Sequence, residues 1–166
     1  MTEDPNNEDA KRALQADWSF DLKILGKHLN VPSDLEGTVR GHLYLENILI
    51  AFLQHALEKP ELLDVERVPF NLKVEFAAAL GLIPTHLIPI LKKINTIRNH
   101  LSHNLKYSIP DQAKNDLLNM FRPSERELIL EFEGEGQQVE VTKVPISHFV
   151  KVVIVLFDLH RQSYVK

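Results

Sequence analysis

The residue in this chain that most needs a chemical explanation is Arg98, because it falls on the apolar face of an expected helix. The stretch from Leu91 to Leu105 has the sequence LKKINTIRNHLSHNL. At about 100° per residue, one helix face collects Leu87, Ile90, Leu91, Ile94, Ile97, Leu101 and Leu105, with Arg98 in their middle. An arginine is almost never fully buried without a partner, so its guanidinium is expected to meet a carboxylate or a ligand.

The neighbours of Arg98 suggest which chemistry this helix could perform. Asn95, Asn99 and Ser102 form a polar strip beside it, and His103 lies further round the helix. A guanidinium presents a planar fork of donors to phosphate oxygens, and a histidine exchanges protons near neutral pH. The combination fits the binding of a phosphate group and acid–base chemistry beside it.

Structural roles explain the same residues without any ligand. Glu46 is expected at the centre of the apolar stripe of a helix that begins after Ser33, and two buried ions of opposite charge are natural partners. We therefore hypothesise that Glu46 and Arg98 meet. His103 could act only as a cation at a helix C-terminus. His100 and His103 have the spacing of a metal pair, but no acidic third ligand accompanies them, so a solvated surface is favoured and neither metal nor cofactor is expected.

The order Arg98-Asn99-x-x-x-His103 resembles the signature of the HEPN superfamily, the higher eukaryotes and prokaryotes nucleotide-binding helical domains. The likeness runs from about Ser33 to Phe121, includes the segment FAAALGLIP, and points to the branch with proteins similar to the mannitol operon repressor. Many members are metal-independent endoribonucleases, often toxins of toxin–antitoxin or phage-defence systems, that act as dimers with two motifs facing a shared cleft. Others are noncatalytic regulators or binding modules.

The resemblance implies a role for each motif residue. His103 is expected to perform general acid–base catalysis, Arg98 to stabilise charge on the phosphate, and Asn99 to orient one or both. In a continuous helix Arg98 and His103 lie roughly 140° apart, so a helix end near His103 or a second subunit is needed to bring them together. Supporting roles fall to Glu46, Ser102 and Asn95, and a local positive rim for substrate to Lys92, Lys93 and Lys106.

The function expected from these residues is metal-independent cleavage of RNA through attack by its 2′-hydroxyl group. The expected partners are a second copy sharing the cleft, an RNA substrate and an antitoxin protein. The alternative is a noncatalytic HEPN-like regulator, or a module that binds nucleotides or RNA. A DNA-binding repressor is weaker than either, because no helix carries the clustered cations of a recognition helix.

Composition narrows the class of protein. The 166 residues are 44% hydrophobic and suit a single domain over 1–166, with a disordered tail over 1–9. There is no cysteine, which excludes disulfide scaffolds and thiol catalysis. No run approaches the roughly 20 apolar residues of a membrane span, and the polar start MTEDPNNEDA favours a cytoplasmic protein. The net charge of −4 argues against a broad nucleic-acid surface, although it permits a small basic cleft.

Periodicity predicts a mainly α fold, an antiparallel helical bundle like that of HEPN domains. Helices are expected over about 14–29, 33–59, 71–79 and 111–121, with one more from Pro84 or Pro89 to about Asn104 and another from Pro145 or Ser147 to about Tyr164. Residues 126–143 alternate apolar and polar side chains around Gly134-Glu135-Gly136, which favours a small β-hairpin. Ser124 and Glu127 have the spacing of a capping box and favour a helical start instead. We predict the hairpin.

Overall fold

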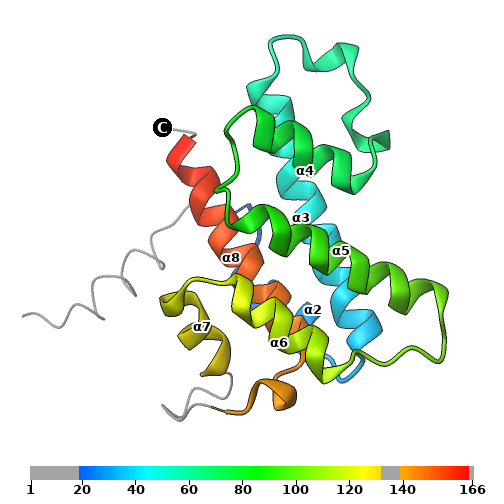
Figure 1. Cartoon of the computed structure of the whole chain (residues 1–166). Coiled ribbons are helices and arrows are strands. Elements are labelled where there is room, and N and C mark those ends of the chain that lie inside the picture. The colour runs from blue at the N-terminus through cyan, green and yellow to red at the C-terminus, as the bar shows by residue number, and fades with distance from the viewer. Residues whose placement is uncertain (1–18, 132–138, 165–166) are drawn as a thin grey trace, which may run out of the picture.

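The protein folds as a bundle of helices (Figure 1). The computed structural model describes residues 19–131 and 139–164, and no strand occurs among them. The prediction of a mainly α fold is therefore confirmed. The helices are α2 (Leu22–Leu29), α3 (Asp34–Ala56), α4 (Phe70–Ala79), α5 (Leu87–His103), α6 (Asp111–Met120), α7 (Pro123–Leu130) and α8 (Ile146–Tyr164), with single 3-10 turns η1 (Pro60–Leu62), η2 (Val65–Arg67) and η3 (Val141–Lys143).

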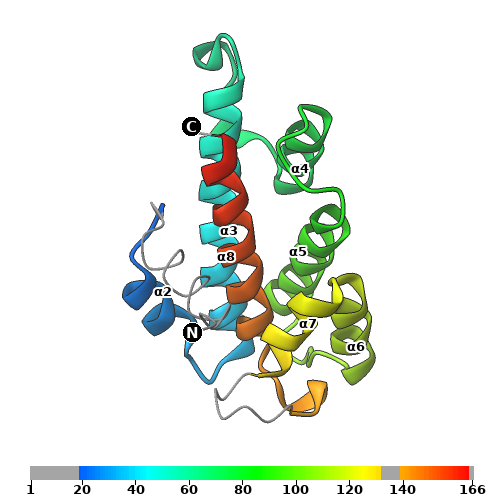
Figure 2. The ribbon, with the colours of Figure 1, turned by 90° about the vertical axis from the view of Figure 1, so that its left-hand side faces the viewer.

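Helix α3 is the centre of the bundle and packs against α2, α4, α5 and α8. Its N-cap is Ser33, as predicted, and the Ser33 hydroxyl accepts a hydrogen bond from the Glu36 amide at 3.2 Å. The helix ends at Ala56, short of the expected Lys59. Figure 2 shows α3 and α8 side by side along most of their length. Every element that forms a candidate site is thus positioned by α3 or by a direct neighbour of it.

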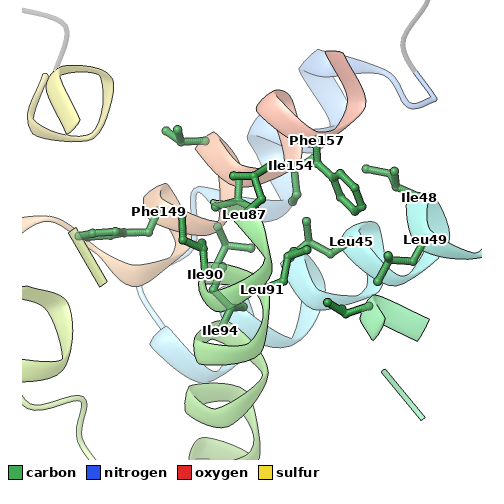
Figure 3. Packing of buried hydrophobic residues seen from close by; sticks show 14 of the residues in the cluster. Leu45, Ile48, Leu49, Leu87, Ile90, Leu91, Ile94, Phe149, Ile154 and Phe157 are labelled. Atoms are coloured by element: carbon green, nitrogen blue, oxygen red, sulfur yellow. The ribbon is translucent and has the colours of Figure 1, made fainter. Parts of the chain in front are cut away.

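The core lies where α3, α5 and α8 face one another (Figure 3). The predicted apolar face of α5 is buried as far as Leu101, whereas Leu105 lies beyond the helix and is 98% exposed. The single apolar stripe expected around Glu46 on α3 does not match the buried face, because Leu43, three residues before Glu46, is 54% exposed, whereas Leu45 and Leu49 are fully buried. The reason is that α3 is covered on more than one side, so its buried arc is too wide for a single stripe to describe.

The predicted antiparallel arrangement holds for α3 and α5 but not for α8. His42 of α3 bonds Asn95 of α5, while Ser102 near the end of α5 lies in a groove with Ser33 at the start of α3. Helix α8 instead runs parallel to α3 (Figure 2), since it touches α3 first at Gly37 and last at Phe52, whose ring centroid is 5.1 Å from that of Phe157. The segment between α5 and α8, which contains α6, α7 and η3, returns the chain to the start of α3, so α8 can run in the same direction as α3.

The predicted β-hairpin over 126–143 is wrong wherever the structure describes it. Residues up to Leu130 belong to α7, and Val141 lies in the 3-10 turn η3, while 132–138 lie outside the described residues. A capping box two residues earlier than the expected one starts α7, because Glu125 accepts a bond from the Arg122 amide at 2.9 Å. The buried positions are Glu125 and Ile129, which are four residues apart and so mark a helical period.

Two further expectations concern the chain before α2 and the membrane. Only Leu22–Leu29 of the expected helix over 14–29 is described as helix, with Asp21 as its N-cap, and residues 1–18 lie outside the described residues. Within the described ranges, none of the helices combines the length and apolar character that crossing a bilayer requires.

The close approach of α3 to α8 gives a test of the fold at Gly41. A Cβ atom at this position would overlap with Val150 Cγ1, and valine has little freedom to move away. We expect Gly41→Ala to lower the free energy of unfolding by about 1 to 3 kcal/mol in chemical denaturation. Gly26→Ala is the matched control, because nothing lies within 4 Å of a Cβ there. It should be neutral or stabilise by up to about 1 kcal/mol, and equal destabilisation by both changes would contradict this packing.

Candidate functional site

A polar cleft lies between α3, α4 and α5 and contains the start of the sequence motif. Its volume is about 270 Å³. We call it the motif cleft and define it by His42, Glu46, Val68, Pro69, Phe70, Asn71, Asn95, Arg98 and Asn99. Three of the predicted site residues on α5 therefore share one cavity with Glu46.

Arg98 is half-buried in the motif cleft, and its partner is its own neighbour. Its Nη1 donates a hydrogen bond to Asn99 Oδ1 at 2.8 Å. The hypothesised ion pair with Glu46 does not form, although both residues line the cleft, and no other carboxylate of the described residues pairs with Arg98. Nη1 is fixed by Asn99, and the remaining N–H groups of the guanidinium are left to bind something else.

Glu46 pairs instead with Lys73 of α4, a residue that the sequence did not single out. Lys73 Nζ donates to Glu46 Oε1 at 2.6 Å and to the Glu66 carbonyl at 3.1 Å. The Lys73 side chain is 0% exposed and that of Glu46 is 25% exposed. A buried ammonium needs this negative partner, whereas the guanidinium of Arg98 keeps contact with the cleft. The expected pairing of Glu46 with Arg98 was wrong because lysine is usually a surface residue, so the sequence offers no reason to expect a buried Lys73.

A chain of side-chain hydrogen bonds crosses the floor of the motif cleft. Asn95 Nδ2 donates to Asn71 Oδ1 at 3.1 Å, so the Asn95 Oδ1 atom faces His42 and accepts from its Nε2 at 3.0 Å. The His42 ring packs against Phe70 with centroids 4.2 Å apart. His42 and Asn71 were not predicted as site residues. The one available signal was that His42 lies one turn before Glu46 on the same helix.

His42 is 2% exposed, and its surroundings favour the uncharged ring. Burial lowers the pKa of His42 below its ordinary value of 6.5, and the positive charge of Arg98 lowers it further, against an opposing effect of the bond to Asn95. The neutral ring then carries its proton on Nε2. The amides of Asn71 and Asn99 each have an oxygen engaged, so the Nδ2 donors of both, together with Arg98, are what the cleft offers to a ligand. Such a donor-rich cleft suits an anion.

The remaining motif residues lie away from the motif cleft. His103 is exposed at the last position of α5, and it does not line the cleft. Since α5 is continuous from Arg98 to His103, the two side chains point about 140° apart. Ser102 lines a separate open groove with Leu35 and Val39 at the start of α3. The structure thus brings Arg98, Asn99 and Asn95 together and leaves His103 and Ser102 outside.

The three lysines expected to form a positive rim differ in their partners. Lys92 pairs with Glu75 at 2.7 Å, and Lys93 lies 4.0 Å from Asp116, so both charges are partly compensated. Lys106 follows α5 on the exposed segment after Asn104, and no carboxylate of the described chain pairs with it. His100 stacks on Tyr107 with ring centroids 5.1 Å apart. Across 19–131 and 139–164, no group of three or more histidine, aspartate or glutamate side chains is placed to hold a metal ion.

Comparison with known proteins adds no relative to this picture. No family model, curated protein or solved structure matches the chain. The assignment of a function therefore depends on the residues and their geometry.

The buried ion pair beneath the cleft gives a stability test. Glu46→Gln removes the negative charge that compensates the buried Lys73 ammonium and leaves it with neutral acceptors only, so we expect the free energy of unfolding to fall by about 2 to 3 kcal/mol in urea denaturation. Glu75→Gln breaks the exposed pair with Lys92 and should cost less than about 1 kcal/mol. Losses of equal size would show that the Lys73 pair contributes no more than a surface pair.

The depressed pKa of His42 predicts how stability depends on pH. The unfolded chain takes up a proton near the ordinary pKa of 6.5 while the folded chain does not, so stability should fall as the pH drops below about 6.5. His148 and His160 also have lowered pKa values and act in the same direction. His42→Gln, whose amide can still bond Asn95, should reduce the slope by at most about 1.4 kcal/mol per pH unit. Urea denaturation between about pH 7.5 and 5 measures both slopes, and an unchanged slope in the variant would rule out this contribution.

Proposed function

We propose that two copies of this chain form a metal-independent endoribonuclease of the HEPN type. The observation that carries the proposal is the state of Arg98, which lies in a donor-rich cleft with no carboxylate partner among the described residues. An arginine kept only to join helices would be expected to pair with Glu46, and it does not. Its free donors match a phosphate group.

The chemistry assigned to these residues is transesterification within RNA. The 2′-oxygen attacks the adjacent phosphorus as its proton passes to a base, the P–O2′ bond forms, and the P–O5′ bond breaks. The leaving 5′-oxygen takes up a proton from an acid, and the products are a 2′,3′-cyclic phosphate and a 5′-hydroxyl end. His103 acts as base or acid, Arg98 stabilises the charge on the phosphate oxygens, and Asn99 holds Arg98 in place.

The geometry of α5 is the reason for invoking two copies. Arg98 and His103 of one chain are about 7.5 Å apart along the helix axis and face different directions. A second copy could set its exposed His103 opposite the first copy's Arg98 across a shared cleft. Acting in the cytoplasm as a toxin, such an enzyme would need an antitoxin protein as its partner.

The second candidate is a noncatalytic module that binds RNA or nucleotides in the motif cleft. The observation that favours it is the position of His103 outside the cleft that holds Arg98. In that case Arg98 and the asparagines bind the phosphate and no bond is cleaved. Loss of RNA binding in Arg98→Gln, in the absence of any cleavage by the wild type, would select this function.

The test of the nuclease is cleavage of mixed-sequence RNA in the presence of a chelator. The wild type should produce 2′,3′-cyclic phosphate ends and arrest growth on expression. His103→Ala should lose both, with a rate about 100-fold or more lower and an unchanged fold by circular dichroism, because this side chain is exposed. His55→Ala, at the exposed end of α3, is the matched control and should stay active.

Mixing inactive variants tests whether the site is shared. If Arg98 and His103 come from different copies, mixed dimers of Arg98→Gln and His103→Ala contain one intact pair and should recover roughly a quarter of wild-type activity. No recovery would assign both residues to one chain. Wild-type protein that leaves varied RNAs intact, with and without chelator, would remove the nuclease proposal.

A further inference from the structure

A second cavity, separate from the motif cleft, lies between the turn that follows α2 and the first turn of α8. Its volume is about 500 Å³, within the usual range for small-molecule sites. Leu29 and Val31 form an apolar wall, and Asn30, Ser147, His148 and Lys151 supply the polar groups. None of these residues lines the motif cleft, so the cavity requires an explanation of its own.

Ser147 is the feature of this cavity that points to a ligand. The residue is 4% exposed, and its hydroxyl has no hydrogen-bond partner in the part of the chain that the structure describes. Ser147 is held firmly against α3, since a Cβ atom at Gly37 would lie only 2.7 Å from Ser147 Cβ. Its Oγ atom is not sealed off from the cavity, so it can donate a hydrogen bond to an acceptor group placed there.

The groups around Ser147 define the charge of that ligand. The first-turn amides of Ile146 and Ser147 have no acceptor within the helix, whereas the His148 amide donates to the Pro145 carbonyl at 3.0 Å. The positive end of the dipole of α8, which spans 19 residues, lies at the same place. Lys151 is four residues after Ser147, so it projects from the same face, and it is exposed without an ion pair among the described residues. His148 Nε2 donates to the Leu128 carbonyl at 3.2 Å, which holds the ring at the cavity wall. The free amides, the helix dipole and the Lys151 ammonium together favour an anionic ligand.

We propose that this cavity binds the phosphate group of a small phosphorylated metabolite. The Ser147 hydroxyl and the free amides of the first turn of α8 donate to the phosphate oxygens, and the Lys151 ammonium compensates their charge. Leu29 and Val31 contact the rest of the metabolite. A larger molecule is required because a phosphate group alone is too small to fill the cavity. The proposal does not depend on the nuclease activity of the motif cleft.

Isothermal titration calorimetry of the full chain tests this site with three probes: inorganic phosphate, adenosine 5′-monophosphate and adenosine. Phosphate and the monophosphate should bind, and adenosine should not. Ser147→Ala and Lys151→Gln should each weaken binding of the monophosphate about tenfold or more. Ser147→Ala should leave the unfolding midpoint unchanged, whereas loss of a structurally required serine would lower it, so affinity lost at an unchanged midpoint is the deciding result.

Two matched controls locate the binding. Lys23→Gln removes an exposed lysine from α2 and should leave the affinity unchanged. The titration is repeated in the Arg98→Gln background, which removes phosphate binding by the motif cleft and leaves the signal of this cavity. Absence of binding at millimolar monophosphate, or affinity lost in Arg98→Gln but kept in Lys151→Gln, would overturn the proposal. Tighter binding of a 5′-phosphorylated oligonucleotide than of the monophosphate would also overturn it, since the ligand would then be an RNA end.

Discussion

The buried ammonium group of Lys73 is the constraint on which the motif cleft depends. A lysine without exposure must find negative charge and hydrogen-bond acceptors inside the protein, and Glu46 and the Glu66 carbonyl provide them. This arrangement ties α4 and the turn η2 to α3. Residues 68–71, which comprise the link after η2 and the start of α4, form one wall of the cleft. Because Glu46 is held by Lys73, Arg98 on the opposite wall remains available to a ligand.

The helical architecture was largely accessible from the sequence, because its signals are local. Ser33 caps α3, and the apolar face of α5 recurs at a helical period as far as Leu101. The error over 126–143 came from short segments, in which a period of two and a period of 3.6 differ in only a few positions. Glu125 decided the outcome through its bond to the Arg122 amide, a choice between two capping boxes that spacing alone could not make. The buried face of α3 was also misjudged, because helices cover it from several sides.

Only half of the candidate site could be predicted from the sequence, for a related reason. A motif groups residues by sequence, whereas a cleft groups them by direction, and five positions along a helix turn a side chain to another face. Arg98 and Asn99 therefore lie in the cleft while His103 does not. The other half of the cleft comes from His42 of α3 and Asn71 of α4, which lie 53 and 24 residues before their partner Asn95. Contacts of this kind depend on the tertiary fold, and a single sequence carries no direct record of them.

The parallel packing of α3 and α8 affects the order in which the helices can fold together. The α3 surface around Gly37 and Gly41 is covered by residues of α8 that follow roughly a hundred positions later in the chain. During synthesis on the ribosome, this surface stays uncovered until α8 has emerged. The earlier helices can assemble around α5, yet the core at Phe52 closes only when Phe157 arrives. A chain cut short before α8 would thus expose the interior face of α3, its central helix.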